Sequence, residues 1–196
     1  QNTVVGYGTM QGVSATAGNT GTGNTIMGYT AGQNIVMGGY NTAVGRQALQ
    51  QNISGSYHVA IGGNAGNNVG RDNNNSTYTT MVGYEAGAYA SGSYNTFLGG
   101  LAGKGGQTSA PYSSGENNTA LGYQALQAFT TGIRNVAVGH NSLEANTTGS
   151  SNTALGRDAG AAMEAGATTY NVLIGTNAGD SITTSQYNVG IGYNTL

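Results

Sequence analysis

Apolar and polar residues alternate in short phrases that recur along the whole chain. The phrase NTALG, for example, occurs both at residues 118–122 and at residues 152–156. Each phrase ends in a glycine, called the anchor below, and successive anchors lie 16 to 23 residues apart, most often 17. A repeat period near 20 residues is typical of a solenoid, in which each repeat forms one coil. The anchors are Gly6, Gly28, Gly45, Gly62, Gly83, Gly99, Gly122, Gly139, Gly156, Gly175 and Gly192.

The three residues before each anchor predict a short β-strand. Position −1 is always apolar and position −3 is always Thr or Val, as in Val136 and Val138. Residues two apart on a strand face the same side, so we expect these two columns of like positions to form the interior stripe. Position −2, which is Ala or Gly in six of the eleven phrases, would then face outward, where a neighbouring subunit packs closely.

Position −4 is Asn in nine of the phrases, while His58 and Thr79 take its place in the other two. Stacked coils would bring these amides within about 4.8 Å of one another, a spacing at which side-chain amides form a hydrogen-bonded ladder. Asn also suits the turn at a coil corner; a catalytic or glycan-bearing role is the alternative. The expected ladder residues are Asn2, Asn24, Asn41, Asn95, Asn118, Asn135, Asn152, Asn171 and Asn188.

A second short segment follows each anchor. Position +3 is small, usually Ala, and position +4 is either Gly or a large aliphatic residue; a further Gly commonly stands seven residues before the next anchor. We therefore expect each coil to contain a strand, a tight turn, a second short strand and a looser turn. No segment shows a helical period. The expected fold is an all-β parallel β-roll or β-solenoid of about eleven coils, forming one domain over residues 1–196.

The composition fits this interpretation and limits the partners. The chain has 36 Gly, one Pro and no Cys, and only 6% of its residues are charged. Such a composition is also typical of disorder, but the regular apolar positions argue against it. The net charge of −2 gives no electrostatic reason to expect nucleic acid as a partner. No apolar run approaches the ~20 residues that span a bilayer, so we expect no membrane insertion of this segment.

Residues that could carry chemistry do not form a recognisable motif. Residues 99–106 read GGLAGKGG, but the phosphate-binding loop requires Ser or Thr directly after its Lys, and Gly105 follows Lys104 here. The two histidines, His58 and His140, occupy different positions of the repeat, and no acidic residue recurs in register. We therefore predict no catalytic site, no metal and no cofactor, and we do not expect an enzyme.

Tyrosines are the candidate surface-binding residues. Those directly after an anchor would form a lengthwise row of amphipathic rings, either stacked on a wet face or binding a glycan or another surface. Two insertions, residues 70–78 and 103–118, lengthen single coils; such loops often carry binding, and neutral drift is the alternative. The second insertion contains Pro111 and Tyr112. The candidate binding residues are Tyr7, Tyr29, Tyr84, Tyr123, Tyr193 and Tyr112.

The sequence NTALGYQAL, followed by TTG and then NVAVG, resembles the head repeats of trimeric autotransporter adhesins. It is even more similar to the related repeats of bacteriophage tail-fibre proteins. The resemblance covers essentially the whole chain and implies a left-handed parallel β-roll, three chains side by side, and a fibre or adhesive head on a cell surface or virion. Many adhesin heads have a shorter repeat, so the exact coil shape can differ here.

Two hypotheses for the function follow. In the first, the chain is a homotrimeric shaft or head of an extracellular fibre that attaches to a glycan or protein on a host cell. In the second, it is a filament subunit that stacks end to end and binds no specific ligand. Neither end carries a polar capping repeat, as expected either of a segment of a longer fibre or of stacked units.

Overall fold

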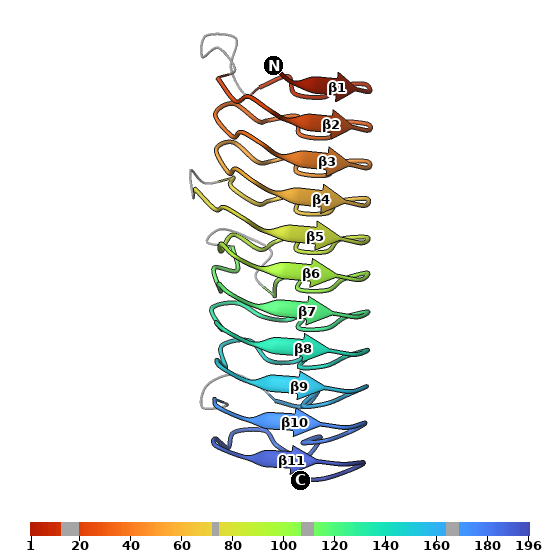
Figure 1. The fold of residues 1–196 in the computed structure, drawn as a ribbon, viewed down its shortest axis with the longest axis vertical. Helices are drawn as coiled ribbons and strands as arrows, with labels where there is room; N and C mark the ends of the chain where they lie inside the picture. Colours follow the sequence, from red (N-terminus) through yellow and green to blue (C-terminus); the bar gives the residue numbers. More distant parts are fainter. Residues whose placement is uncertain (13–19, 72–74, 107–111, 164–168) are drawn as a thin grey trace.

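The computed structural model describes residues 1–12, 20–71, 75–106, 112–163 and 169–196. Eleven short strands form one sheet in which every strand pairs in parallel with its neighbours in the sequence, and the chain advances steadily from β1 at one end of the stack to β11 at the other (Figure 1). The described residues contain no helix. This confirms the all-β parallel solenoid. The strands are β1 Thr3–Val5, β2 Thr25–Met27, β3 Thr42–Val44, β4 Val59–Ile61, β5 Thr80–Val82, β6 Thr96–Leu98, β7 Thr119–Leu121, β8 Val136–Val138, β9 Thr153–Leu155, β10 Val172–Ile174 and β11 Val189–Ile191.

Each strand occupies positions −3 to −1 before its anchor, and like positions lie directly over like. Thr119 pairs with Val136, for instance, and Ala120 with Ala137. The repeat period is clear in the sequence because each anchor position requires Gly. The φ angles of the anchors lie between 127° and 143°, which L residues with a side chain rarely adopt. A Cβ added to Gly122 would also lie 2.6 Å from the carbonyl oxygen of Gly139, so only Gly allows consecutive coils to stack this closely.

The core lies on the face of the sheet opposite to the one that the residue pattern predicted. From Ile26 to Gly190 the residue at position −2 is buried, whereas positions −1 and −3 are half-buried or exposed in every strand. The predicted interior stripe and the predicted outward Ala column are therefore both wrong. Alternation distinguishes the two faces of a strand, but it does not say which face meets the rest of the coil. The interior is narrow, and Ala fits it because the Ala column at position +3, for example Ala125, is also completely buried there.

In most coils the narrow core receives a large side chain from position −2 or from position +4. Position +7 adds a further buried column, which supplies the large residue in the coils of β4 and β9, where positions −2 and +4 are Ala and Gly. The members of this column are Ile35, Val69, Phe129, Met163 and Ile182. Phe97 is paired with Gly103, and an added Cβ on this glycine would collide with the phenyl ring. In the coil of β7 the sizes are reversed, because Ala120 is followed by Leu126, and both are fully buried. Close packing of this kind tolerates neither voids nor extra volume. In the coils of β2, β3, β5, β6, β7, β8, β10 and β11, the choice of Gly or a large residue at position +4 thus complements the residue at position −2.

The segment after each anchor forms turns, and the second short strand expected there is absent from the described residues. Positions +2 and +4 have positive φ, as at Gln124 (57°) and Leu126 (53°), which no strand allows. The backbone still bonds from coil to coil: the Leu126 N–H donates to the Ser142 carbonyl at 2.9 Å, and the Gln124 N–H donates to Gly100 at 3.0 Å. The turn segment therefore closes the core with hydrogen bonds that resemble those of a sheet.

Candidate functional site

The outer face of the sheet is uncharged and uncovered along the whole stack, with apolar residues at position −1 and Thr or Val at position −3. It consists of positions −3 and −1, with Leu98, Leu121 and Leu155 each more than 40% exposed. No charged residue occurs in either column. Among the described residues, all exposed large hydrophobic side chains except Val4, Met37 and Leu196 belong to these columns or to the two tyrosine columns that border the strands, at positions −5 and +1. We call positions −3 and −1 of all coils the sheet face.

The predicted tyrosines at position +1 are exposed but do not form a continuous row. Tyr7 and Tyr29 stack at 5.5 Å between ring centroids, and Tyr123 stacks on His140 at 5.6 Å. Tyr84 has no aromatic neighbour in its column among the described residues, because Gly63 and Gly100 occupy that position in the adjacent coils. Tyr193 follows Thr176 in the same way. The sequence identified these residues but not the interruptions between them.

A second tyrosine column at position −5 was missed by the sequence interpretation. Tyr40, Tyr57, Tyr78 and Tyr94 stack face to face with centroid distances of 5.2, 4.8 and 5.7 Å. Their φ angles are all positive, between 55° and 60°. Because each inner ring is covered on both faces, the row presents ring edges and hydroxyl groups, which does not suit stacking against a sugar ring. The signal was present in the sequence, since six tyrosines share this position of the repeat: these four, and Tyr170 and Tyr187, which stack at 5.2 Å.

The Asn residues at position −4 stack in a column whose amides bind the neighbouring coils. The Asn118 side-chain oxygen accepts hydrogen bonds from the backbone N–H and the side-chain amide of Asn135, at 2.9 and 3.1 Å. The Asn135 amide also donates to the Gly149 carbonyl at 2.8 Å. The members Asn24, Asn41, Asn95, Asn118, Asn135, Asn152 and Asn171 are almost completely buried. A buried, bonded amide stabilises the coil corner and is not accessible to a ligand.

His58 replaces Asn in this column and is completely buried. Its Nδ1 accepts a hydrogen bond from the Thr79 N–H at 3.3 Å, and its Nε2 lies 3.4 Å from the Ser76 hydroxyl. Burial lowers the pKa of the imidazole to about 4, although the hydrogen bonds to Ser76 and Thr79 act in the opposite direction. The ring is therefore neutral at physiological pH and serves as a structural member of the column.

The two insertions meet on the turn side of the stack. Arg71, from the first insertion, donates a hydrogen bond to the Tyr112 hydroxyl of the second at 2.6 Å, and Tyr112 stacks on Tyr89 at 6.4 Å. Tyr112 is only 7% exposed, so the prediction that it is a surface-binding residue is wrong. Its ring instead anchors the second insertion. Residues 72–74 and 107–111 of the insertions, including Pro111, lie outside the described residues.

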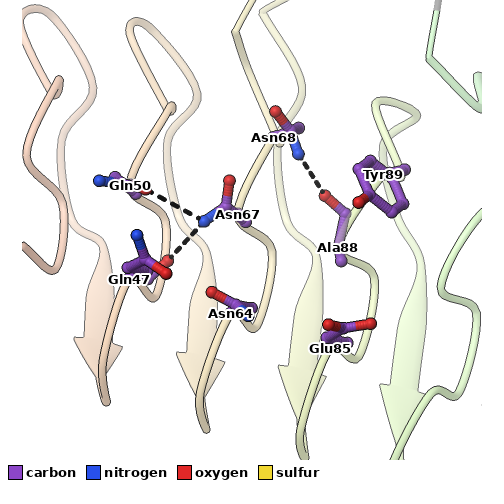
Figure 2. A pocket seen from close by; sticks show the side chains of 8 residues that line it. All are labelled: Gln47, Gln50, Asn64, Asn67, Asn68, Glu85, Ala88 and Tyr89. Atoms are coloured by element: carbon purple, nitrogen blue, oxygen red, sulfur yellow. Dashed lines mark hydrogen bonds between the residues drawn. The ribbon is translucent and has the colours of Figure 1, made fainter. Parts of the chain in front are cut away.

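Next to this contact lies a polar hollow of about 230 Å³, formed by the turn segments that follow β3, β4 and β5 (Figure 2). Amide side chains dominate its lining, with the carboxylate of Glu85 among them (Figure 2). Sequence analysis did not find this site, because its residues are common turn residues that only the stacking brings together. The lining residues are Gln47, Gln50, Asn64, Asn67, Asn68, Glu85, Ala88 and Tyr89.

The carboxylate of the hollow is held in its charged form. Glu85 forms an ion pair with Lys104 at 2.8 Å. Partial burial alone would raise the pKa of Glu85, but hydrogen bonds from Lys104, Tyr84 and Asn64 outweigh burial and lower it. The same contacts raise the pKa of Lys104, chiefly through its hydrogen bond to Glu85. The pair is neutral as a whole, so the hollow carries hydrogen-bonding groups without net charge.

Neither a metal site nor a membrane span emerges from the described part of the chain. No three His, Cys, Asp or Glu side chains there lie close enough together to hold a metal ion. Within the same residues, no helix has the length and apolar character needed to cross a bilayer.

Comparisons with protein-family models, with curated proteins and with solved structures found no match to the chain.

Proposed function

We propose that this chain is a structural and adhesive segment of an extracellular fibre, a shaft or head in a surface adhesin or virion tail fibre that mediates attachment to a host cell. In this proposal copies of the chain associate side by side as a homotrimer through the sheet face. The observation that carries the proposal is this uncharged and uncovered face, on which the exposed apolar side chains of position −1 run from β1 to β11 beside the tyrosine columns. Large exposed apolar patches on soluble proteins mark interaction sites.

The size of the sheet face suits an interface between subunits. Ten steps of about 4.8 Å between strands, and three residues of about 3.3 Å in each strand, give a flat area of roughly 480 Å². With the bordering tyrosine columns, from position −5 to position +1, the area rises to roughly 1,100 Å². A standard interface buries about 800 Å² on each partner. The choice of a trimer over other oligomers rests on the resemblance of the repeats to those of trimeric adhesins and tail fibres.

Continuity of the face favours a copy of the same chain as the partner. The columns run without a break from β1 to β11, so a partner that covers them must repeat with the same spacing between strands. A second solenoid of this sequence meets that requirement. Because its strands have the same spacing, each Leu or Val of one chain finds an equivalent row on its neighbour. Symmetric association of identical chains is also the commonest form of oligomer.

Multi-angle light scattering of the purified chain tests the association. We expect a discrete mass of three chains over a wide range of concentrations. Growth of the mass with concentration would instead support the filament hypothesis, and the mass of a single chain at all concentrations would contradict the proposal. The variant Leu121→Asp places a charge in the middle of the sheet face and is expected to give single, folded chains.

Attachment is tested separately with the same material. The labelled assembly is applied to an array of cell-surface glycans and to intact cells, with the dispersed Leu121→Asp chain as the control. We expect binding to at least one glycan or cell type, and stronger binding by the assembly because several sites act together. An assembly that binds none of these surfaces would leave a purely structural fibre and remove the adhesive part of the proposal.

A further inference from the structure

We propose that the polar hollow beside Ala88 is a binding site for a single ring of a neutral saccharide. The proposal rests on the attachment function above, because it names the place on the fibre where a cell-surface glycan is held. It moves the recognition of sugars away from the tyrosine columns, where the sequence pattern had placed it, to the turn side of the stack.

The hollow exists because a ladder of side-chain amides stops at Ala88. At position +5 the Gln33 amide donates to Gln11 at 3.2 Å, and Gln50 donates to Gln33 at 2.9 Å. Asn67 continues the ladder with a bond to Gln50 at 3.4 Å. The next residue in this column is Ala88, whose methyl group cannot reach Asn67. One rung is missing, and the space that it would fill is the hollow (Figure 2).

The groups around the missing rung are suited to hydroxyl groups. The Asn67 amide nitrogen is already bonded to the Gln47 backbone carbonyl and to Gln50, which leaves its oxygen as an acceptor. Asn64 lines the same space as Glu85, and its side-chain amide adds a donor and an acceptor. The Gln47 side chain offers both a donor and an acceptor. A sugar hydroxyl is donor and acceptor at once, and neighbouring amides and carboxylates match that dual character.

One wall of the hollow is held in place by tertiary contacts. The Asn68 amide donates to the Ala88 carbonyl at 3.2 Å and accepts from Arg71 at 3.3 Å. Arg71 and Tyr89 both contact Tyr112, as described above. The wall is therefore fixed before a ligand arrives, which reduces the entropy lost on binding.

Charge and volume narrow the class of ligand to a neutral monosaccharide unit. The nearby cation Lys104 is engaged by Glu85, and Arg71 is bonded to Asn68 and Tyr112. Neither cation is among the residues that line the hollow, so the lining offers no positive charge to a phosphate or a carboxylate sugar. Glu85 is the single acidic residue in the lining, which is too few for the oxygen cage that Ca²⁺ requires. The volume of about 230 Å³ lies below the roughly 300–1,000 Å³ of sites for drug-sized ligands, as expected for one ring.

Association through the sheet face leaves the hollow open. The turn segments bury positions +3 and +4 against position −2 of the strands, so their outer surface lies across the core from the sheet face. A fibre built as proposed would display one such hollow on each chain, and a branched surface glycan could contact several of them together.

The experiment restores the missing rung. The substitution Ala88→Gln places at position +5 the residue that already stands there at Gln33 and Gln50. Ala88 is only 3% exposed, so the longer side chain has to extend into the hollow, and the thermal midpoint of the variant checks that the fold is kept. Ala161→Gln is the matched control, since Ala161 occupies position +5 of a distant coil. Each protein is titrated with neutral hexoses and N-acetylhexosamines, with N-acetylneuraminic acid as the acidic probe. Binding is followed by saturation-transfer NMR, and light scattering is recorded for every sample.

We expect the native chain and Ala161→Gln to bind at least one neutral sugar and Ala88→Gln to lose that signal at unchanged mass and unchanged thermal midpoint. Equal binding by Ala88→Gln would overturn the site, and binding of only the acidic sugar, or of no sugar, would overturn the ligand class. The mass measured by light scattering distinguishes a failure of the sugar site from a failure of the fibre assembly. A trimer without sugar binding refutes the hollow alone, whereas sugar binding by a single chain refutes the fibre assembly alone.

Discussion

Two neighbouring residues of β8 test which face of the sheet is the core. Ala137 is completely buried between Ala120 and Ala154 of the adjacent strands, whereas Val138 is half-buried on the sheet face. In Ala137→Asp the new carboxyl group finds no partner in this apolar row. Keeping an Asp of ordinary pKa 3.9 protonated at pH 7 costs about 4 kcal/mol, and burying the neutral group without hydrogen bonds adds roughly 1–3 kcal/mol.

The total of roughly 5–7 kcal/mol is comparable to the whole stability of a typical domain, about 5–15 kcal/mol. Ala137→Asp should therefore be largely unfolded at pH 7. In Val138→Asp the carboxylate stays in water, and the change in strand preference is within about 1 kcal/mol. This variant should fold, but as single chains, because the charge lies in the proposed interface.

Circular dichroism during urea titration measures folding, and light scattering of the same samples measures association. The raised folded-state pKa of the Asp in Ala137→Asp also sets a pH dependence. Its folded form binds the proton more tightly than the unfolded chain, so stability should recover as the pH falls from 7 towards 4. If Val138→Asp unfolds the chain and Ala137→Asp does not, the core lies on the other face and the packing described here is wrong.

Further substitutions test the backbone, the packing and the buried histidine. Gly62→Ala should unfold or strongly destabilise the chain, because its φ is 136° and the added Cβ would lie 2.5 Å from a facing carbonyl oxygen. The control Gly63→Ala, whose added Cβ has its nearest contact at 3.5 Å, should lower the urea midpoint only slightly. Equal effects of the two substitutions would refute the close backbone stacking. Leu126→Gly should lower the free energy of unfolding by about 2–5 kcal/mol, and adding Ala120→Leu should restore part of this loss. If the two substitutions have strictly additive effects in a double-mutant cycle, the two positions do not complement each other in size. Because burial lowers the pKa of His58 from 6.5 to about 4, the folded state binds this proton less tightly than the unfolded chain, so stability should be complete above pH 6.5 and fall by up to about 3 kcal/mol as the pH drops towards 4. His58→Asn should remove this pH dependence. If the variant loses as much stability at low pH as the native chain does, groups other than His58 cause the loss.

The repeat made the strands predictable, since a Gly that must stack on Gly fixes the register of every coil. The strands occupy the three residues before each anchor, where the pattern placed them. The direction of the core was not predictable from hydrophobicity alone, because the narrow interior selects Ala43 and Ala60 while the larger Val44 and Ile61 remain on the sheet face. A better signal was available in the pairing of sizes, as with Phe97 and Gly103 or Ala120 and Leu126.

The candidate sites depended on contacts that no single repeat contains. The hollow requires the ladder to stop at Ala88 between two coils, and its wall requires Arg71 to meet Tyr112, 41 residues away. The tyrosine column at position −5 was within reach of the sequence, because Tyr40, Tyr57 and their equivalents share one position. Its stacked geometry was not, since positive φ at tyrosine is uncommon.

The most direct test of the central claim, that copies of the chain join through the sheet face, is cross-linking through single cysteines. The chain has no Cys, so Thr119→Cys introduces one reactive thiol on the sheet face and Gln127→Cys introduces one across the core, on the turn side. Each variant is treated with a short bismaleimide and separated on a denaturing gel. The account predicts covalently linked chains from Thr119→Cys and single chains from Gln127→Cys. Linked chains only from Gln127→Cys, or from neither variant, would contradict it.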